Sequence, residues 1–174
     1  MSLLTEIHRS EGVNVNGKTI FRDAVRAVIL REHKLLLVYS PVNGDYKFPG
    51  GGVNIGETHE HALIREVHEE CGVHTAKFMA DCVGSIIEYD IPMEVDFDVF
   101  KMTSYYYFCQ VEDGFGAQAL EDYETDLGFK PVWVNIDEAI LNNKQILQNN
   151  ARKFPQWLRR EIFMLEYVKQ SFKK

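Results

Sequence analysis

The first part of the chain alternates short apolar runs with turn signals. Residues 13–21 place Asn16-Gly17 between two β-prone segments, and this dipeptide is a strong short-range signal for a β-hairpin. Two near-continuous apolar runs follow, Ala24–Leu30 and Leu35–Ser40, with the polar sequence REHK between them. Continuous apolar strands are typical of burial on both faces of a sheet. The pattern therefore predicts an N-terminal hairpin at about 13–21 and a second hairpin directly after it.

A helical period replaces the strand pattern after the glycine-rich sequence PGGGVNIGE. Leu63, Val67 and Cys71 recur at four-residue spacing, as apolar residues do on the buried face of a helix. Thr58 can accept a hydrogen bond from a first-turn amide, and Gly72 can adopt the left-handed conformation that ends many helices. The sequence thus predicts a helix from about Thr58 to Cys71.

The second half of the chain predicts strands first and helices last. The expected elements are strands at Lys77–Glu88, Met102–Val111 and Pro131–Val134, and helices at about 135–148 and 155–172. Residues 112–128 form a polar segment with six carboxylates, and loops of this length are often functional. Strands with one helix in the middle and two at the end predict an α/β fold, a mixed β-sheet flanked by helices.

Length and composition favour one globular domain. A chain of 174 residues is long enough for a substantial core, because it buries about 70% of the surface that it exposes when unfolded. Hydrophobic residues make up 45% of the chain, as in ordinary globular proteins. No internal repeat or linker-like stretch divides the sequence, so we expect a single domain over residues 1–174.

The charge balance argues against two classes of partner. A formal net charge of -7 and a pI of about 5.4 are not those of a protein with a large basic footprint for duplex nucleic acid or an anionic membrane. The start of the chain lacks a signal-peptide pattern, and no apolar run approaches the roughly 18 residues of a membrane span. Three cysteines without CxxC spacing favour reduced thiols. We therefore expect a soluble, cytoplasmic protein.

Three glutamates share one face of the first predicted helix. Glu66, Glu69 and Glu70 fall within an arc of about 100°. Like charges at this spacing cost only about 0.2–0.5 kcal/mol per pair, so a solvated face is the ordinary explanation. The alternative is a site for a hard divalent cation, because Mg²⁺ commonly binds one or two carboxylates together with substrate phosphates. Arg65, four residues before Glu69, can orient a carboxylate in either case.

The glycine-rich loop before the helix favours the second explanation. Its glycines allow backbone to approach a ligand closely, and the positive end of a helix favours phosphate oxygens. We therefore expect Gly51 and Gly52 to contact the substrate. The sequence GGVNIGET has the glycine spacing of a P-loop, but Glu57 replaces the lysine that would meet the phosphates. The GxGxxG dinucleotide pattern also fails, because Ile55 occupies its last glycine position.

The spacing of these motifs carries a specific resemblance. Gly51, five residues, Glu57, seven residues and then REVHEECGV match every fixed position of the Nudix box, GX5EX7REUXEEXGU with U aliphatic. The match runs from Gly51 to Val73. On this box the chain resembles the MutT-like Nudix hydrolases. Elsewhere the likeness is limited to length and to the order of elements.

The resemblance implies a fold, a reaction and a metal site. Nudix hydrolases are α/β/α sandwiches that use Mg²⁺ or Mn²⁺ to cleave a phosphoanhydride bond in a nucleoside diphosphate linked to another moiety. The implied metal ligands are the carboxylates of Glu66, Glu69 and Glu70 and the backbone carbonyl of Gly50. Arg65 and Glu57 match the pair that holds the box together and orients its carboxylates.

Residues outside the three glutamates can complete the site. Water attack on phosphorus needs a general base within hydrogen-bond reach, and in the family this is a box glutamate or a carboxylate on a distant loop. Glu121 and Glu124, in LEDYETD, are the distal candidates. His59, near the acidic face, is a candidate substrate contact. Tyr89, sixteen residues after Val73, matches a marker tyrosine of dinucleoside polyphosphate hydrolases. Ordinary surface or core positions explain these residues equally simply.

Several alternatives stay open at this point. The substrate is expected to be a small nucleotide: an ADP-ribose-like compound, a dinucleoside polyphosphate or a nucleoside triphosphate. A non-catalytic nucleotide sensor on the same scaffold is a second class of function, and an isomerase is a third. The predicted N-terminal hairpin is a candidate element for a homodimer.

Overall fold

Two β-sheets and the helices that flank them make up residues 2–149 and 154–171, which are the residues described in this computed structural model. The strands are β1 (Leu3–His8), β2 (Thr19–Val28), β3 (Leu30–Arg31), β4 (Lys34–Tyr39), β5 (Tyr46–Lys47), β6 (Thr75–Asp90), β7 (Val99–Val111) and β8 (Lys130–Asn135). The helices are α1 (His59–Cys71), α2 (Asp122–Leu127), α3 (Ile136–Asn149) and α4 (Leu158–Ser171).

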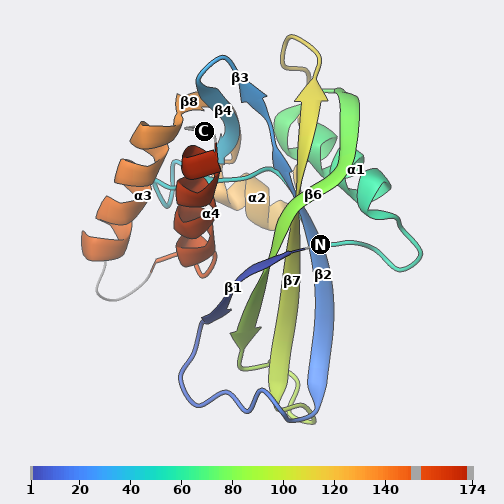
Figure 1. Cartoon of the computed structure of the whole chain (residues 1–174), viewed down its shortest axis with the longest axis vertical. Helices are drawn as coiled ribbons and strands as arrows, with labels where there is room; N and C mark the ends of the chain where they lie inside the picture. Colours follow the sequence, from blue (N-terminus) through green and yellow to red (C-terminus); the bar gives the residue numbers. More distant parts are fainter. Residues whose placement is uncertain (1, 150–153, 172–174) are drawn as a thin grey trace.

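The first sheet is mixed and the second is antiparallel. The first has the strand order β1-β6-β7-β2, with β1 parallel to β6, β6 antiparallel to β7, and β2 parallel to β7. In the second, β4 pairs with β3, β5 and β8. Figure 1 shows α1 on one side of these sheets and α3 and α4 on the other.

Strand β4 packs against helices on both of its faces. Leu36 and Val38 belong to the core cluster under α1, whereas Leu35 and Leu37 belong to the cluster under α3 and α4. All four side chains are fully buried. Successive side chains of a strand point to opposite faces, so a continuous apolar run fits a strand covered on both sides. The predicted α/β fold with flanking helices is therefore confirmed.

The predicted N-terminal hairpin at 13–21 is wrong. Gly17 does close a turn by donating its N–H to the carbonyl of Asn14, but the residues on either side of the turn do not pair with each other. Thr19 begins β2, which pairs with β7 in parallel along its whole length, and β1 pairs in parallel with β6. A ten-residue ladder makes more backbone hydrogen bonds than a short local hairpin. The suggested dimer element therefore loses its basis.

Two differences occur in the second half of the chain. The polar segment 112–128 contains a short helix, α2, which the carboxylate-rich sequence did not indicate. The last helix begins at Leu158 rather than Pro155, because the N–H of Leu158 donates to the carbonyl of Pro155 in a turn. Residue 172, the predicted helix end, lies outside the described residues. Trp157 therefore lies in the turn before α4 and not on the helix.

The glycine-rich segment is fastened along the edge of β2. The N–H groups of Val25 and Ala27 donate to the carbonyls of Gly51 and Pro49, at 2.9 and 2.8 Å. Gly50 has a φ of 138°, and a Cβ there would collide with the carbonyl oxygen of Val25. Only glycine suits this approach. The loop thus lies beside β2 and leads directly into α1.

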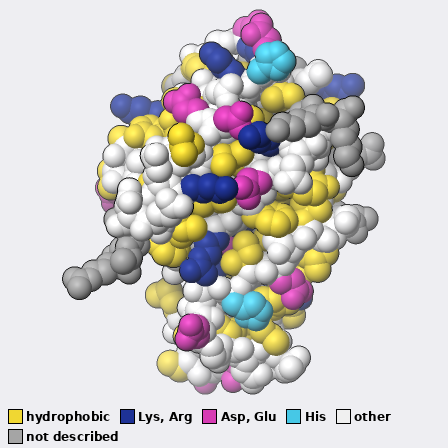
Figure 2. Space-filling model, turned by 60° about the vertical axis from the view of Figure 1, so that its left-hand side comes forward, with side chains coloured by type: hydrophobic (Ala, Val, Ile, Leu, Met, Phe, Trp, Pro, Cys, Tyr) yellow, Lys and Arg dark blue, Asp and Glu magenta, His cyan; other side chains and the backbone are white. Residues whose placement is uncertain are grey.

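Charges of both signs are interspersed on the surface. Figure 2 shows Lys and Arg side chains lying among Asp and Glu side chains, with hydrophobic areas between them. In the described part of the chain, no helix is long and apolar enough to span a membrane.

Candidate active site

Helix α1 fixes the orientation of the three box glutamates. The Thr58 side chain accepts a hydrogen bond from the His61 N–H, and Gly72 ends the helix in the left-handed conformation. The apolar stripe of Leu63 and Val67 is fully buried against the sheet. Glu66 and Glu70, which flank this stripe, are buried with it, whereas a third of the Glu69 side chain is exposed.

Arg65 connects four parts of the box. Its Nε and Nη2 donate to the two oxygens of Glu57 at 2.8 and 2.9 Å, and Nη2 also donates to the carbonyl of Gly52 at 3.0 Å. Its Nη1 donates to Glu66 at 2.8 Å and to Glu69 at 3.0 Å. Hydrogen bonds from Arg65 lower the pKa of Glu57 to about 2. The expected pairing of Arg65 with Glu57 is present, and it braces the glycine loop against the helix.

Glu70 is held differently from the other two glutamates. Its Oε1 accepts from Lys47 Nζ at 2.5 Å, and its Oε2 accepts from the Gly50 N–H at 2.8 Å. Burial raises the pKa of Glu70 to about 7, against the opposing effect of Lys47. Both oxygens of this carboxylate are therefore held by groups beside the pocket, and Lys47 is a pocket-lining residue that the sequence did not indicate.

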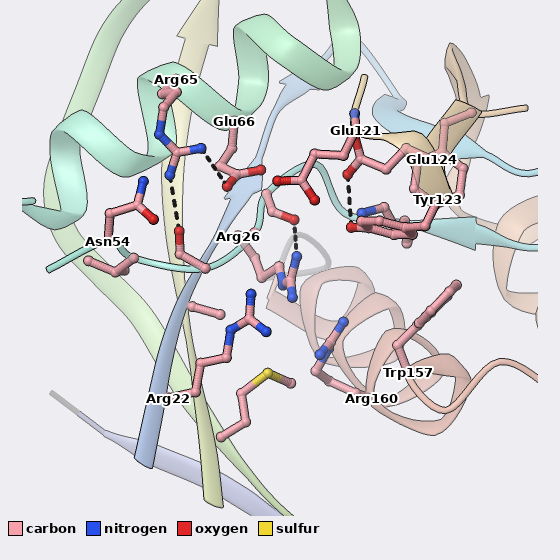
Figure 3. A pocket seen from close by; sticks show the side chains of 18 of the residues that line it. Arg22, Arg26, Asn54, Arg65, Glu66, Glu121, Tyr123, Glu124, Trp157 and Arg160 are labelled. Carbon is pink, nitrogen blue, oxygen red and sulfur yellow. Dashed lines mark hydrogen bonds and ion pairs between the residues drawn. The ribbon is translucent and has the colours of Figure 1, made fainter. Parts of the chain in front are cut away.

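A pocket of about 430 Å³ lies beside the glycine loop. Its basic lining residues are Arg9, Arg22, Arg26, Lys47, Arg65 and Arg160. Its acidic lining residues are Glu66, Glu121 and Glu124. Gly50, Gly51 and Gly52 also line it, as the loop composition led us to expect. The pocket thus brings a box glutamate, both distal carboxylates and a group of cations together (Figure 3).

Helix α2 presents its two candidate bases in different ways. Glu124 is buried and accepts hydrogen bonds from the Tyr123 hydroxyl at 2.9 Å and the Glu121 N–H at 3.0 Å. Glu121 is exposed, and Figure 3 shows its carboxylate pointing toward Glu66. Burial and the neighbouring Glu124 raise the pKa of Tyr123. Of the two carboxylates, that of Glu121 is the better placed to reach a group held at Glu66.

Several pocket residues come from parts of the chain that contain no motif. Trp157 donates its indole N–H to Asp45 at 2.6 Å, and Arg160 pairs with Glu161 and Glu88 at 2.7 Å each. Only Arg22 and Arg26 had a sequence signal. They are the two arginines of β2, and residues four apart in a strand share a face.

Two predicted substrate contacts are not among the residues that line the pocket. The ring of His59 lies on Tyr105 at 4.5 Å, and its Nδ1 is hydrogen-bonded to the Tyr107 hydroxyl at 2.8 Å. The ring of Tyr89 stacks on His8 at 5.1 Å. His59 therefore packs against β7 on the α1 side of the sheet, and Tyr89 lies near the far end of β6.

The donor set has the chemistry that a hard divalent cation requires. Glu66 and Glu69 share one guanidinium nitrogen, so their carboxylates lie close together, and the Glu121 carboxylate points toward Glu66. Carboxylate oxygens are the ligands that Mg²⁺ prefers. Among the described residues, however, no three acidic, histidine or cysteine side chains already converge as a metal cluster. The carbonyl of Gly50, an expected ligand, accepts a hydrogen bond from Arg26.

Comparison with known proteins identifies the family. The profile of the NUDIX domain matches residues 20–158, which include the whole glycine loop, α1 and α2. The chain belongs to the Nudix family. The match begins within β2, so the arginines of this strand also lie inside the Nudix domain.

Curated relatives of this Nudix chain match it over part of their length. An ADP-ribose pyrophosphatase of Methanocaldococcus jannaschii is 42% identical over 53 residues, covering 29% of this chain and 31% of that protein. An RNA pyrophosphohydrolase of Pseudomonas savastanoi pv. phaseolicola is 33% identical over 78 residues, covering 43% and 48%. The matched segments thus span less than half of these relatives.

A solved structure supports the fold. The MutT protein from Methanosarcina mazei Go1 superposes with a TM-score of 0.53 at 20% sequence identity, covering 87% of this chain and 96% of that one. At this level of identity the likeness concerns the Nudix fold alone.

Proposed function

We propose that this Nudix chain is a divalent-cation-dependent pyrophosphohydrolase of small nucleotides. The observation that carries the proposal is the meeting of three groups in one pocket: Glu66 of the box, Glu121 of α2, and the cations beside the glycine loop. Carboxylates suit cations, and guanidinium groups suit phosphate oxygens. A diphosphate accompanied by a metal ion has both kinds of charge.

Each group has a role in the proposed reaction. Glu66 and Glu69 would hold Mg²⁺ or Mn²⁺, with Arg65 fixing the positions of their carboxylates. When bound, such an ion neutralises phosphate oxygens and lowers the pKa of bound water. Glu121 would accept a proton from the water that attacks phosphorus. Lys47 and the Gly50 N–H hold Glu70, which keeps the glycine loop in place beside the pocket.

A small nucleotide is the substrate class that the pocket and the relatives favour together. The pocket volume of about 430 Å³ falls within the usual range of small-molecule sites, roughly 300–1,000 Å³. The relatives' names, ADP-ribose pyrophosphatase and RNA pyrophosphohydrolase, both refer to a pyrophosphate bond next to a nucleoside. Tyr123 and Trp157 line the pocket and offer aromatic faces for a base.

The test is hydrolysis of a substrate panel with a matched pair of variants. The purified protein would be assayed with Mg²⁺ or Mn²⁺ on ADP-ribose, a dinucleoside polyphosphate, CTP and an RNA with a 5′-triphosphate. We expect turnover of at least one, lost on addition of EDTA and strongly reduced in Glu69→Gln. The control is Glu60→Gln, an exposed glutamate in the first turn of the same helix. Absence of product from every substrate, or full activity in Glu69→Gln, would overturn the proposal.

A further inference from the structure

Strand β2 presents two arginines on one face. Arg22 and Arg26 alternate with the small Ala24, and all three line the pocket. Val25, which lies between the two arginines, and Ala27, which follows Arg26, point the opposite way, into the core cluster that contains the residues of α1. The strand therefore separates a hydrophobic face under α1 from a basic face in the pocket.

These two arginines differ from the other pocket cations in their partners. Arg65, Lys47, Arg160 and Arg9 each form an ion pair with a glutamate. Among the residues that the structure describes, neither Arg22 nor Arg26 has a carboxylate within ion-pair distance. Among the described pocket cations, those without a direct carboxylate partner thus lie on β2.

Arg26 is the more unusual of the pair because it is buried. Its exposed fraction is 7%, its Nη1 donates to the carbonyl of Gly50, and its Nε has no hydrogen-bond partner in the described structure. Burial and the nearby Arg160 lower the pKa of Arg26. Glu161 and Glu70 act on this guanidinium from a distance in the opposite direction, but no carboxylate contacts it in the described structure. A buried guanidinium without a direct partner is costly, and a bound anion would supply that partner. Arg22, at the exposed end, extends the same face toward solvent.

The glycine loop places this basic face next to the reaction centre. A Cβ on Gly51 would meet the Glu66 carboxylate, and a Cβ on Gly52 would meet the Arg22 guanidinium at 2.7 Å. The loop is therefore bounded by a glutamate on one side and an arginine on the other. Figure 3 shows Glu66 and Arg65 above the loop and Arg22 and Arg26 below it. Because Glu66, Arg22 and Arg26 all line the same pocket, a single ligand bound there faces the glutamate and both arginines.

We propose that Arg22 and Arg26 bind the phosphoryl group adjacent to the one that is attacked, and so determine which end of the diphosphate faces Glu66. The inference rests on the proposed function for the identity of the ligand. Guanidinium groups favour phosphate oxygens through charge-assisted hydrogen bonds, often two at a time. The attacked phosphoryl group then lies between Glu66 and Glu121, and the adjacent group lies on β2.

The test is binding of inorganic pyrophosphate in EDTA, measured by calorimetry, so that no cation on the glutamates contributes. We expect the wild type to bind, and Arg22→Gln to bind at least tenfold more weakly. Arg26→Gln should lose more affinity than Arg26→Lys, which keeps the charge without the planar fork. Arg31→Gln is the control, because Arg31 is an exposed arginine on β3 that pairs with Asp113 outside the pocket.

Hydrolysis kinetics separate this inference from the proposed function. On a substrate that the wild type hydrolyses, Arg22→Gln should raise KM about tenfold or more while the Arg31→Gln control stays unchanged. Activity with unaltered pyrophosphate affinity and KM in Arg22→Gln would overturn the inference alone. If pyrophosphate binding depends on Arg22 and Arg26 but no substrate is hydrolysed, the proposed function is overturned and the inference about the two arginines is retained.

Folding of the variants is checked in the same samples. Thermal unfolding with and without pyrophosphate should show a stabilising shift in the wild type and Arg31→Gln that is lost in Arg22→Gln. Arg22 is exposed, so its variant carries the test even if Arg26→Gln fails to fold. A wild type that neither binds pyrophosphate nor is stabilised by it would contradict the inference.

Discussion

The charged side chains on the two sides of the glycine loop differ in their ion-pair partners. On the α1 side, Glu57, Glu66 and Glu69 converge on Arg65, and Glu70 is paired with Lys47. On the β2 side, two arginines face the pocket without a described carboxylate partner. Each of these four carboxylates on the α1 side is therefore paired with one of two cations, whereas the two arginines on the β2 side have no direct carboxylate partner among the described residues.

This difference separates structural from ligand-dependent effects. Removing one partner from a compensated network leaves another charge unpaired, so substitutions on the α1 side should affect both stability and activity. Removing an arginine that has no direct ion pair breaks no such network, so substitutions on the β2 side should affect ligand binding most. Five substitutions, three in the α1-side network and two at α2, test how far this contrast holds.

The largest effect is expected from Glu66→Gln. Glu66 is the one box glutamate that both lines the pocket and is held by Arg65. Losing its charge weakens cation binding, which supplies several kcal/mol of transition-state stabilisation, so activity should fall by about 10³-fold or more. The measurement is kcat at saturating substrate and Mg²⁺, with Glu60→Gln as the control. Retention of a tenth of wild-type kcat would argue that Glu66 belongs to the structural network alone.

The next effect distinguishes the two candidate bases, Glu121 at the N-cap of α2 and Glu124 within the helix. Glu121 points toward Glu66, whereas Glu124 accepts hydrogen bonds from Tyr123 and from the backbone of Glu121. A general base contributes about 10²–10⁴-fold, so Glu121→Gln should lower kcat by at least about 10²-fold with little change in stability. Glu124→Gln should mainly lower the melting temperature. The reverse pattern in kcat and thermal unfolding would move the catalytic role to Glu124.

A smaller loss is expected from Arg65→Lys. Lysine keeps the positive charge but cannot make the two parallel hydrogen bonds to Glu57 while also reaching Glu66 and Glu69. Residues that orient metal ligands typically contribute 10–100-fold, so activity should fall by about that factor. The apparent affinity for Mg²⁺ should fall in parallel, measured from activity against metal concentration. A change in kcat with unaltered Mg²⁺ dependence would mean that Arg65 does not act through the metal ligands.

The α1 side of the site could be predicted from the sequence because its interactions are local. Arg65, Glu66 and Glu69 lie within two helical turns, so their spacing alone places them together. The continuous apolar runs likewise predicted that β4 would be buried on both faces. The N-terminal hairpin failed because pairing with β7, about eighty residues away along the chain, outweighed a local turn signal.

The rest of the pocket could not be predicted for the same physical reason. Lys47, Arg160 and Trp157 come from three separate segments, and their roles depend on contacts that only the folded chain makes. From the sequence, Arg22 and Arg26 could have been recognised as two arginines on one face of a strand. The sequence does not show which face of β2 is covered by α1 and which lines the pocket. That depends on the position of the glycine loop along β2.

The smallest effect is expected on the free energy of unfolding, through the Glu57–Arg65 pair on the α1 side, and it should depend on pH. The folded-state pKa of Glu57 is about 2, below the ordinary value of 4.5, because Arg65 donates to its carboxylate. Stabilisation from a lowered pKa is complete above the ordinary value and is lost as pH falls toward the folded value. Glu57→Gln should therefore lower the free energy of unfolding by about 2 kcal/mol at pH 7. The difference from wild type, measured by urea unfolding, should shrink to roughly half or less at pH 3. An equal difference at both pH values would show that Glu57 acts through packing, and that the α1 side is less dependent on charge compensation than its hydrogen bonds imply.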